Sequence, residues 1–138
     1  MGKEFVNYVG ASGEAAVAGM FLKRGYNVFV PVFGTPGVDM IVDIKGRLLR
    51  IQVKTSKGST SAIRYRAWST GGETYDGVAD WLALYSLHYG VAAFLKPEEA
   101  AVYPTIRYDR PKDSAHPTER MQYARDFSID RVIKEAAG

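Results

Sequence analysis

Hydrophobic and polar side chains alternate along residues 38–54, which is the pattern of β-strands that bury one face. A Lys45-Gly46-Arg47 turn divides the run into two arms, so the pattern predicts a β-hairpin. On the polar face, pairing across this turn would place Asp39 roughly opposite Gln52 and Lys54. The hairpin would therefore bring an acid, an amide and a lysine together. The residues predicted for the buried face are Val38, Met40, Val42, Ile44, Leu49, Ile51 and Val53.

A helical pattern and a short strand precede the hairpin. Residues 3–24 carry apolar side chains at three-to-four spacing, which predicts an amphipathic helix that is broken or loosened near residues 10–13. Gly25 would end this helix. Residues 26–32 predict a strand toward the edge of a sheet, because Pro31 cannot donate a ladder hydrogen bond.

The second half of the chain predicts further strands and a final helix. The predicted elements are strands at 62–68, 80–86 and 91–95, a helical turn at 97–100, a long mobile connection at 103–119 and a terminal helix at 120–137, interrupted or capped near Ser128. The strands at 80–86 and 91–95 would form a second hairpin. This order predicts an α/β or α+β fold, in which helices flank a single sheet.

Length and composition are those of one globular domain spanning residues 1–138. Hydrophobic residues make up 46% of the chain and charged residues 24%, which is ordinary for a soluble protein. No stretch approaches the length of a membrane span, and no apolar signal-peptide run follows the first residues. We therefore expect a cytoplasmic protein without a membrane partner.

The chain holds few residues that bind soft metals. It has no cysteine, which excludes disulfides, thiolate zinc sites and a thiol nucleophile, and it has only two histidines. A bound metal would be held by oxygen atoms, which favours Mg²⁺ or Mn²⁺.

Positive charge gathers in one part of the sequence. Residues 44–72 contain seven lysine and arginine residues, no aspartate or glutamate, and two aromatic residues. Such a run can bind a polyanion, and Lys57, Arg64 and Arg66 are the residues expected to contact phosphates. The alternative is a solvated basic loop.

Glu14 is a further candidate because it lies in the predicted first helix beside Gly13 and Ala15. A carboxylate between small residues can face inward with little steric cost. The alternative is an ordinary acid on the surface of the helix.

Together Glu14, Asp39 and the Gln52-Val53-Lys54 run, set in a helix-strand-strand-strand order, resemble the active site of the PD-(D/E)XK nuclease superfamily. This superfamily includes restriction endonucleases, archaeal Holliday-junction resolvases and homing endonucleases of group I introns. The chain is similar to its Gln-x-Lys variants, because Gln52 stands where most members have glutamate. Val38 stands where many members have proline.

The resemblance implies an α/β restriction-endonuclease-like core, in which helices flank a mixed β-sheet. It implies a Mg²⁺-dependent or Mn²⁺-dependent endodeoxyribonuclease, a phosphodiester hydrolase that binds DNA and acts as a homodimer. The implied catalytic residues are Glu14, Asp39, Gln52 and Lys54, and the implied metal ligands are Glu14, Asp39, Gln52 and the Val53 carbonyl.

Two other functions remain open on the same fold. One is a Holliday-junction resolvase, which would cleave four-way junctions in preference to linear duplexes. The other is a DNA-binding module without catalytic activity. Each residue also has a structural alternative: Asp39 could cap a turn, Gln52 could be an ordinary strand amide, and Lys54 could protect a strand end.

Overall fold

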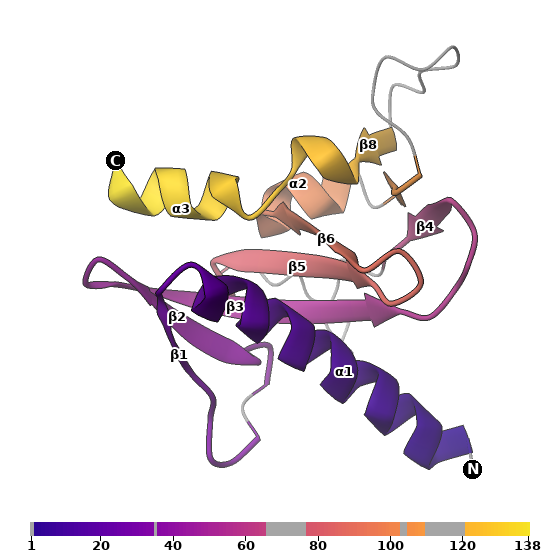
Figure 1. The fold of residues 1–138 in the computed structure, drawn as a ribbon, viewed down its shortest axis with the longest axis horizontal. Coiled ribbons are helices and arrows are strands. Elements are labelled where there is room, and N and C mark those ends of the chain that lie inside the picture. The colour runs from indigo at the N-terminus through magenta and orange to yellow at the C-terminus, as the bar shows by residue number, and fades with distance from the viewer. Residues whose placement is uncertain (1, 35, 66–76, 103–104, 110–120) are drawn as a thin grey trace.

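The computed structural model describes residues 2–34, 36–65, 77–102, 105–109 and 121–138 (Figure 1). The helices are α1 (Gly2–Lys23), α2 (Pro97–Val102) and α3 (Asp130–Ala137), with a short 3-10 helix at Ala124–Asp126. The strands are β1 (Asn27–Phe29), β2 (Met40–Ile44), β3 (Arg47–Ser56), β4 (Ala62–Arg64), β5 (Trp81–Ser86), β6 (Val91–Leu95), β7 (Thr105–Arg107) and β8 (Met121–Tyr123).

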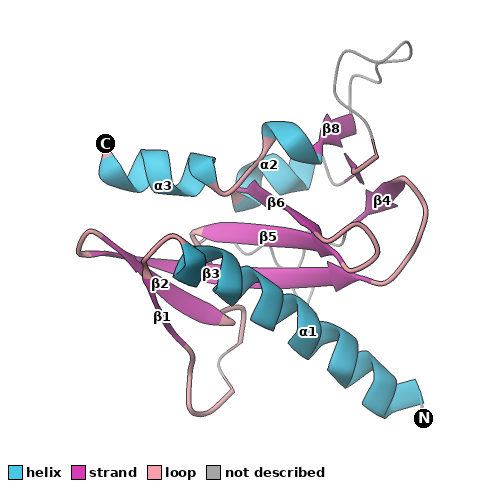
Figure 2. Cartoon of the chain, in the orientation of Figure 1, coloured by secondary structure: helices cyan, strands magenta, loops and turns pink. Residues whose placement is uncertain are grey.

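Five strands form the main sheet, in the order β1-β2-β3-β5-β6. The β3 and β5 strands pair in parallel, whereas the other neighbours are antiparallel, so the sheet is mixed. Figure 2 shows α1 running across these strands. The predicted fold class is therefore confirmed, as is the predicted hairpin of β5 and β6.

The β2–β3 hairpin forms as predicted, except that its turn is one residue shorter. Met40 pairs with Ile51, and Ile44 pairs with Arg47, which is the first residue of β3. Lys45 and Gly46 alone make the turn, with φ angles of 54° and 87°. These are the positive values that a two-residue hairpin turn requires. The predicted apolar face is buried from Met40 to Val53, and Val38 is half-buried.

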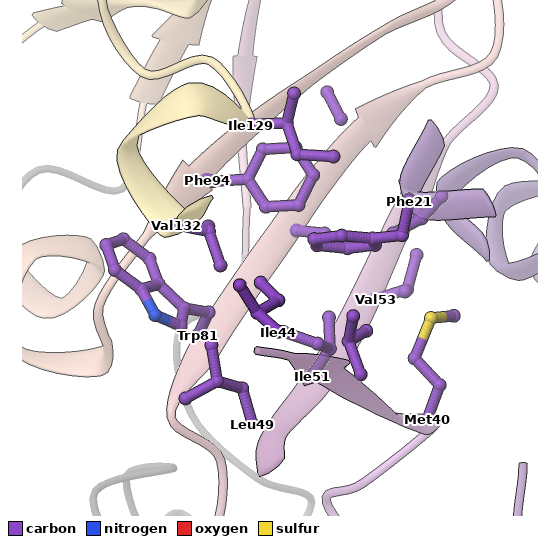
Figure 3. Close-up of a cluster of buried hydrophobic side chains, with 14 residues drawn as sticks. Phe21, Met40, Ile44, Leu49, Ile51, Val53, Trp81, Phe94, Ile129 and Val132 are labelled. Atoms are coloured by element: carbon purple, nitrogen blue, oxygen red, sulfur yellow. The ribbon is translucent and has the colours of Figure 1, made fainter. Parts of the chain in front are cut away.

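Two hydrophobic clusters lie on opposite faces of the main sheet. On one face, α1 and α3 cover the apolar sides of β2, β3, β5 and β6. There Phe21 of α1 packs edge to face on Phe94 of β6, with 5.8 Å between the ring centroids (Figure 3). On the other face, α2 and the small β4-β7-β8 sheet cover Leu82 and Leu84. The main sheet is thus held between two layers, and β3 lies at its centre.

In the first part of the chain, the predicted break in the helix is wrong, and the predicted strand is shorter than expected. The first helix is continuous through residues 10–13. Its Gly13 is buried against Thr55 of β3, so this glycine serves a close helix–strand approach and does not break the helix. The first strand covers only Asn27–Phe29 and forms the sheet edge, as expected for a segment that runs into a proline.

The C-terminal part also differs from its prediction. Residues 105–107 and 121–123 are strands, where a mobile connection and the start of a helix were expected. The β7 strand pairs with β4 on one side and with β8 on the other, and local periodicity does not reveal such pairing between distant segments. The final helix begins only at Asp130. In the described part of the chain, no helix combines the length and apolar content needed to cross a membrane.

Candidate active site

Asp39 is fixed at the point where the chain enters β2. Its backbone N–H donates to the Ile51 carbonyl at 2.9 Å, and its Oδ2 atom accepts the Val53 N–H at 2.7 Å. The carboxylate is therefore oriented by β3 itself. Turn capping alone does not describe its position, because Asp39 bonds to the partner strand.

Glu14 reaches Asp39 from the helix. Its side chain is half-buried and lines one pocket with that of Asp39. Burial, the negative charge of Asp39 and hydrogen bonding to its carboxyl group all raise the pKa of Glu14. Burial also raises the pKa of Asp39, against the opposing effects of the Val53 N–H, the Lys54 charge and the Glu14 hydrogen bond. A cation bound between these two acids would offset the repulsion of their negative charges and the cost of burying them.

Gln52 follows Ile51, the β3 residue that pairs with Met40, and its side chain lies on the same side of β3 as that of Lys54. Its Oε1 atom is buried and has no hydrogen-bond partner within the described residues. A buried amide oxygen without a protein partner can accept a hydrogen bond from water or coordinate a cation.

Lys54 lies two residues after Gln52 in β3 and completes the cluster. Its side chain is half-buried, and its positive charge lowers the pKa of Asp39 against the effect of burial. The predicted proximity of Asp39 and Lys54 is thus supported, and Gln52 shares the side of β3 on which Lys54 lies.

An open pocket of about 290 Å³ gives access to the two acids. Glu14 and Asp39 line it together with Val30, Pro31, Gly34 and Val38. The part of the wall formed by Val30, Pro31 and Gly34 was not predicted from the sequence. The only signals for it were the apolar residues that continue past the short strand and the Pro31 and Gly34 breakers that end it.

The donor atoms fit a hard divalent cation. They are the carboxylates of Glu14 and Asp39 and the unpartnered Oε1 of Gln52. The Val53 carbonyl points to the same side of β3 as its N–H, which is the side of Asp39. An all-oxygen set of this kind suits Mg²⁺ or Mn²⁺. The described residues contain no cluster of three or more aspartate, glutamate, histidine or cysteine residues, so neutral oxygens would have to complete the shell.

The basic run does not form one surface. Arg50 makes a bidentate ion pair with Asp80, at 3.0 and 3.1 Å, and this residue therefore stabilises the β3–β5 contact. Lys57 and Arg64 are exposed beyond the end of β3 and in β4. Arg66 lies outside the described residues.

Comparisons with known proteins agree on one class. A family model described as PD-(D/E)XK endonuclease matches residues 6–85, more than half of the chain and all of the predicted site. Among solved structures, a bacterial homing endonuclease, I-Ssp6803I, has a similar fold, with a TM-score of 0.69 over 94% of this chain and 91% of that chain. The two sequences are 18% identical. No curated protein matches the chain in sequence.

Proposed function

This chain belongs to the PD-(D/E)XK endonuclease family, and from this premise we propose that it is a metal-dependent DNA endonuclease that hydrolyses phosphodiester bonds. One observation carries the proposal: Glu14 and Asp39 line one open pocket and lie close enough that each shifts the pKa of the other. A module that only binds DNA has no need for two adjacent acids, because carboxylates repel the phosphate backbone.

Each residue of the cluster has a role in this proposal. Glu14, Asp39, Gln52 and the Val53 carbonyl would hold Mg²⁺ or Mn²⁺, which would supply positive charge and acidify a water molecule. Asp39 is the central ligand, because β3 fixes its carboxylate through the Val53 N–H. The Lys54 ammonium stabilises negative charge that develops on the phosphate during the reaction. These roles make the cluster a phosphodiesterase site.

We propose that DNA is positioned by three cations of the basic run, the exposed Lys57 and Arg64 and also Arg66, which lies outside the described residues. Their contacts with phosphates would fix the backbone without reading its sequence. Replacing Lys57 and Arg64 by alanine should weaken binding to any duplex and reduce the slope of binding against salt concentration by about 0.9 per lost contact.

The enzyme is also proposed to act as a homodimer. Each copy of the domain contributes the cluster described above, and cutting both strands of a duplex requires two such clusters. Sedimentation of the protein alone and with a duplex would test this, and a monomer in both conditions would contradict it.

Nicking of a supercoiled plasmid in Mg²⁺, Mn²⁺ or EDTA tests the proposed activity. We expect nicking in the presence of either metal and none in EDTA, and Asp39→Asn should abolish it while binding remains. Asp43→Asn is the matched control, since Asp43 lies four residues along the same strand, roughly 13 Å away, and accepts the Gly46 N–H of the turn. Undiminished cutting by Asp39→Asn would refute the site. A four-way junction in the same assay measures any preference for branched DNA.

A further inference from the structure

The segment between β1 and β2 exposes a run of apolar side chains. We call residues 30–34 the apolar loop. Val30 is 67% exposed, Val32 91% and Phe33 84%, and the loop contains no charged residue. In Figure 1 this segment projects from the lower edge of the sheet. Neighbouring apolar side chains that are this exposed mark a contact surface more often than scattered ones do.

The position of this loop is more informative than its exposure. Val30, Pro31 and Gly34 form part of the wall of the pocket that contains Glu14 and Asp39. Val30 and Pro31 also line a second pocket of about 290 Å³, together with Phe29 and Ile41, on the outer side of the hairpin. The loop thus stands at the rim of the candidate active site, between the acids and a mainly apolar hollow.

We propose that the apolar loop contacts DNA, packing Val32 and Phe33 against deoxyribose and base surfaces beside the phosphate that is cut. This inference rests on the proposed endonuclease activity, since it assumes a phosphodiester in the pocket of Glu14 and Asp39. Each phosphate in DNA is flanked by sugars with apolar C–H faces and by bases with apolar faces. Apolar side chains are used in this way by proteins that distort DNA.

The geometry favours DNA over a second copy of the chain at this surface. A protein partner seated on Val30 and Pro31 would cover the mouth of the pocket, because these residues form its wall. It would then block access to the two acids. A strand of DNA that places a phosphate in the pocket has to pass this wall in any case.

A photo-reactive side chain identifies the occupant directly. The change Val32→p-benzoylphenylalanine places a group that reacts with nearby C–H bonds on DNA or protein. We expect a protein–DNA product with a mixed-sequence 30-base-pair duplex in EDTA, where the duplex is not cut. Val102→p-benzoylphenylalanine is the control, because Val102 is an exposed valine (59%) in α2, on the opposite side of the molecule in Figure 1. A product between two protein chains, or no product above the Val102 control, would overturn the proposal.

Binding measurements supply a second, independent readout. Val32→Ser should weaken duplex binding roughly tenfold, because burying a valine contributes about that much. Its salt slope should stay that of the parent, since no charge is removed, whereas Lys57→Ala should lower the slope. Unchanged affinity would refute the loop contact. If the parent protein neither binds nor nicks DNA, the endonuclease proposal itself fails, so the two failures can be told apart.

Discussion

The change Gly13→Ala should impair both stability and activity, although it adds only one methyl group. A Cβ at residue 13 would lie 1.8 Å from Thr55 Oγ1, 2.8 Å from its Cβ and 2.9 Å from its Cγ2. Rotation of the Thr55 side chain can move Oγ1, but the Cβ atom is fixed to the backbone of β3. The helix must therefore shift away from the strand, and Glu14 shifts with it.

The expected magnitudes follow from two opposing effects. Alanine in a helix interior is favoured over glycine by roughly 0.8–1 kcal/mol, whereas overpacking costs about 1–3 kcal/mol. Gly19→Ala is the matched control, because Gly19 lies in the same helix and a Cβ added to it would have nothing within 4 Å. Urea unfolding should therefore place Gly13→Ala about 1–3 kcal/mol below Gly19→Ala.

Plasmid nicking should report the displacement of Glu14 more strongly than unfolding does. A shift near 1 Å in a catalytic group can cost about 100-fold in rate, so we expect a loss of that order for Gly13→Ala. Adding Thr55→Gly removes all three contacting atoms and should restore much of the nicking rate. The reasoning is refuted if Gly13→Ala unfolds and nicks DNA like Gly19→Ala.

Three further predictions concern single side chains. Gln52→Glu should bind Mg²⁺ more tightly in calorimetry and lower the Mg²⁺ concentration for half-maximal nicking, because ligand charge raises affinity; unchanged curves would remove residue 52 from the metal site. Burial alone would raise the pKa of Glu99, but hydrogen bonds from Arg131 and the Lys96 N–H hold it below its usual range. These interactions stabilise the folded protein by about 1 kcal/mol, because the pair is partly exposed. The stabilisation is fully present above the pKa that Glu99 has in the unfolded chain, and it is lost as the pH falls through the lower pKa that Glu99 has in the folded protein. Glu99→Gln should therefore reduce the fall of the urea unfolding midpoint at acid pH. Tyr108→Phe removes a buried hydroxyl that donates to the Leu84 carbonyl at 2.7 Å, and it should lower the free energy of unfolding by roughly 1–3 kcal/mol. A variant as stable as the wild type would show that this hydrogen bond does not stabilise the fold.

The sequence was most informative where structure is local. The alternation along residues 38–54 predicted the hairpin and its buried face, because strand pairing across a short turn depends on neighbouring residues alone. Its turn was misjudged by one residue, since Lys45 adopts a positive φ that few residues other than glycine and asparagine favour. The second sheet was missed because β4, β7 and β8 are brought together only by tertiary packing.

The candidate site was predictable only in part, and for a related reason. Asp39, Gln52 and Lys54 belong to one hairpin, so pleat geometry was enough to predict the proximity of Asp39 and Lys54. The wall formed by Val30, Pro31 and Gly34 was not predictable, because it depends on the path of the chain after β1 ends at Phe29. The basic run was misleading at Arg50, whose partner Asp80 lies outside the run.

The position of Glu14 depends on two contacts that act on α1 in different ways. Phe21 packs edge to face on Phe94, which fixes the rotation of the helix about its axis. Gly13 rests on Thr55, which fixes the distance between the helix and β3. The apolar spacing within the helix can predict the first contact, but nothing in it distinguishes Gly13 from Gly10 or Gly19, which have open space around them. One small contact between distant segments therefore decides whether the acid of the helix and the acid of the hairpin form a single site.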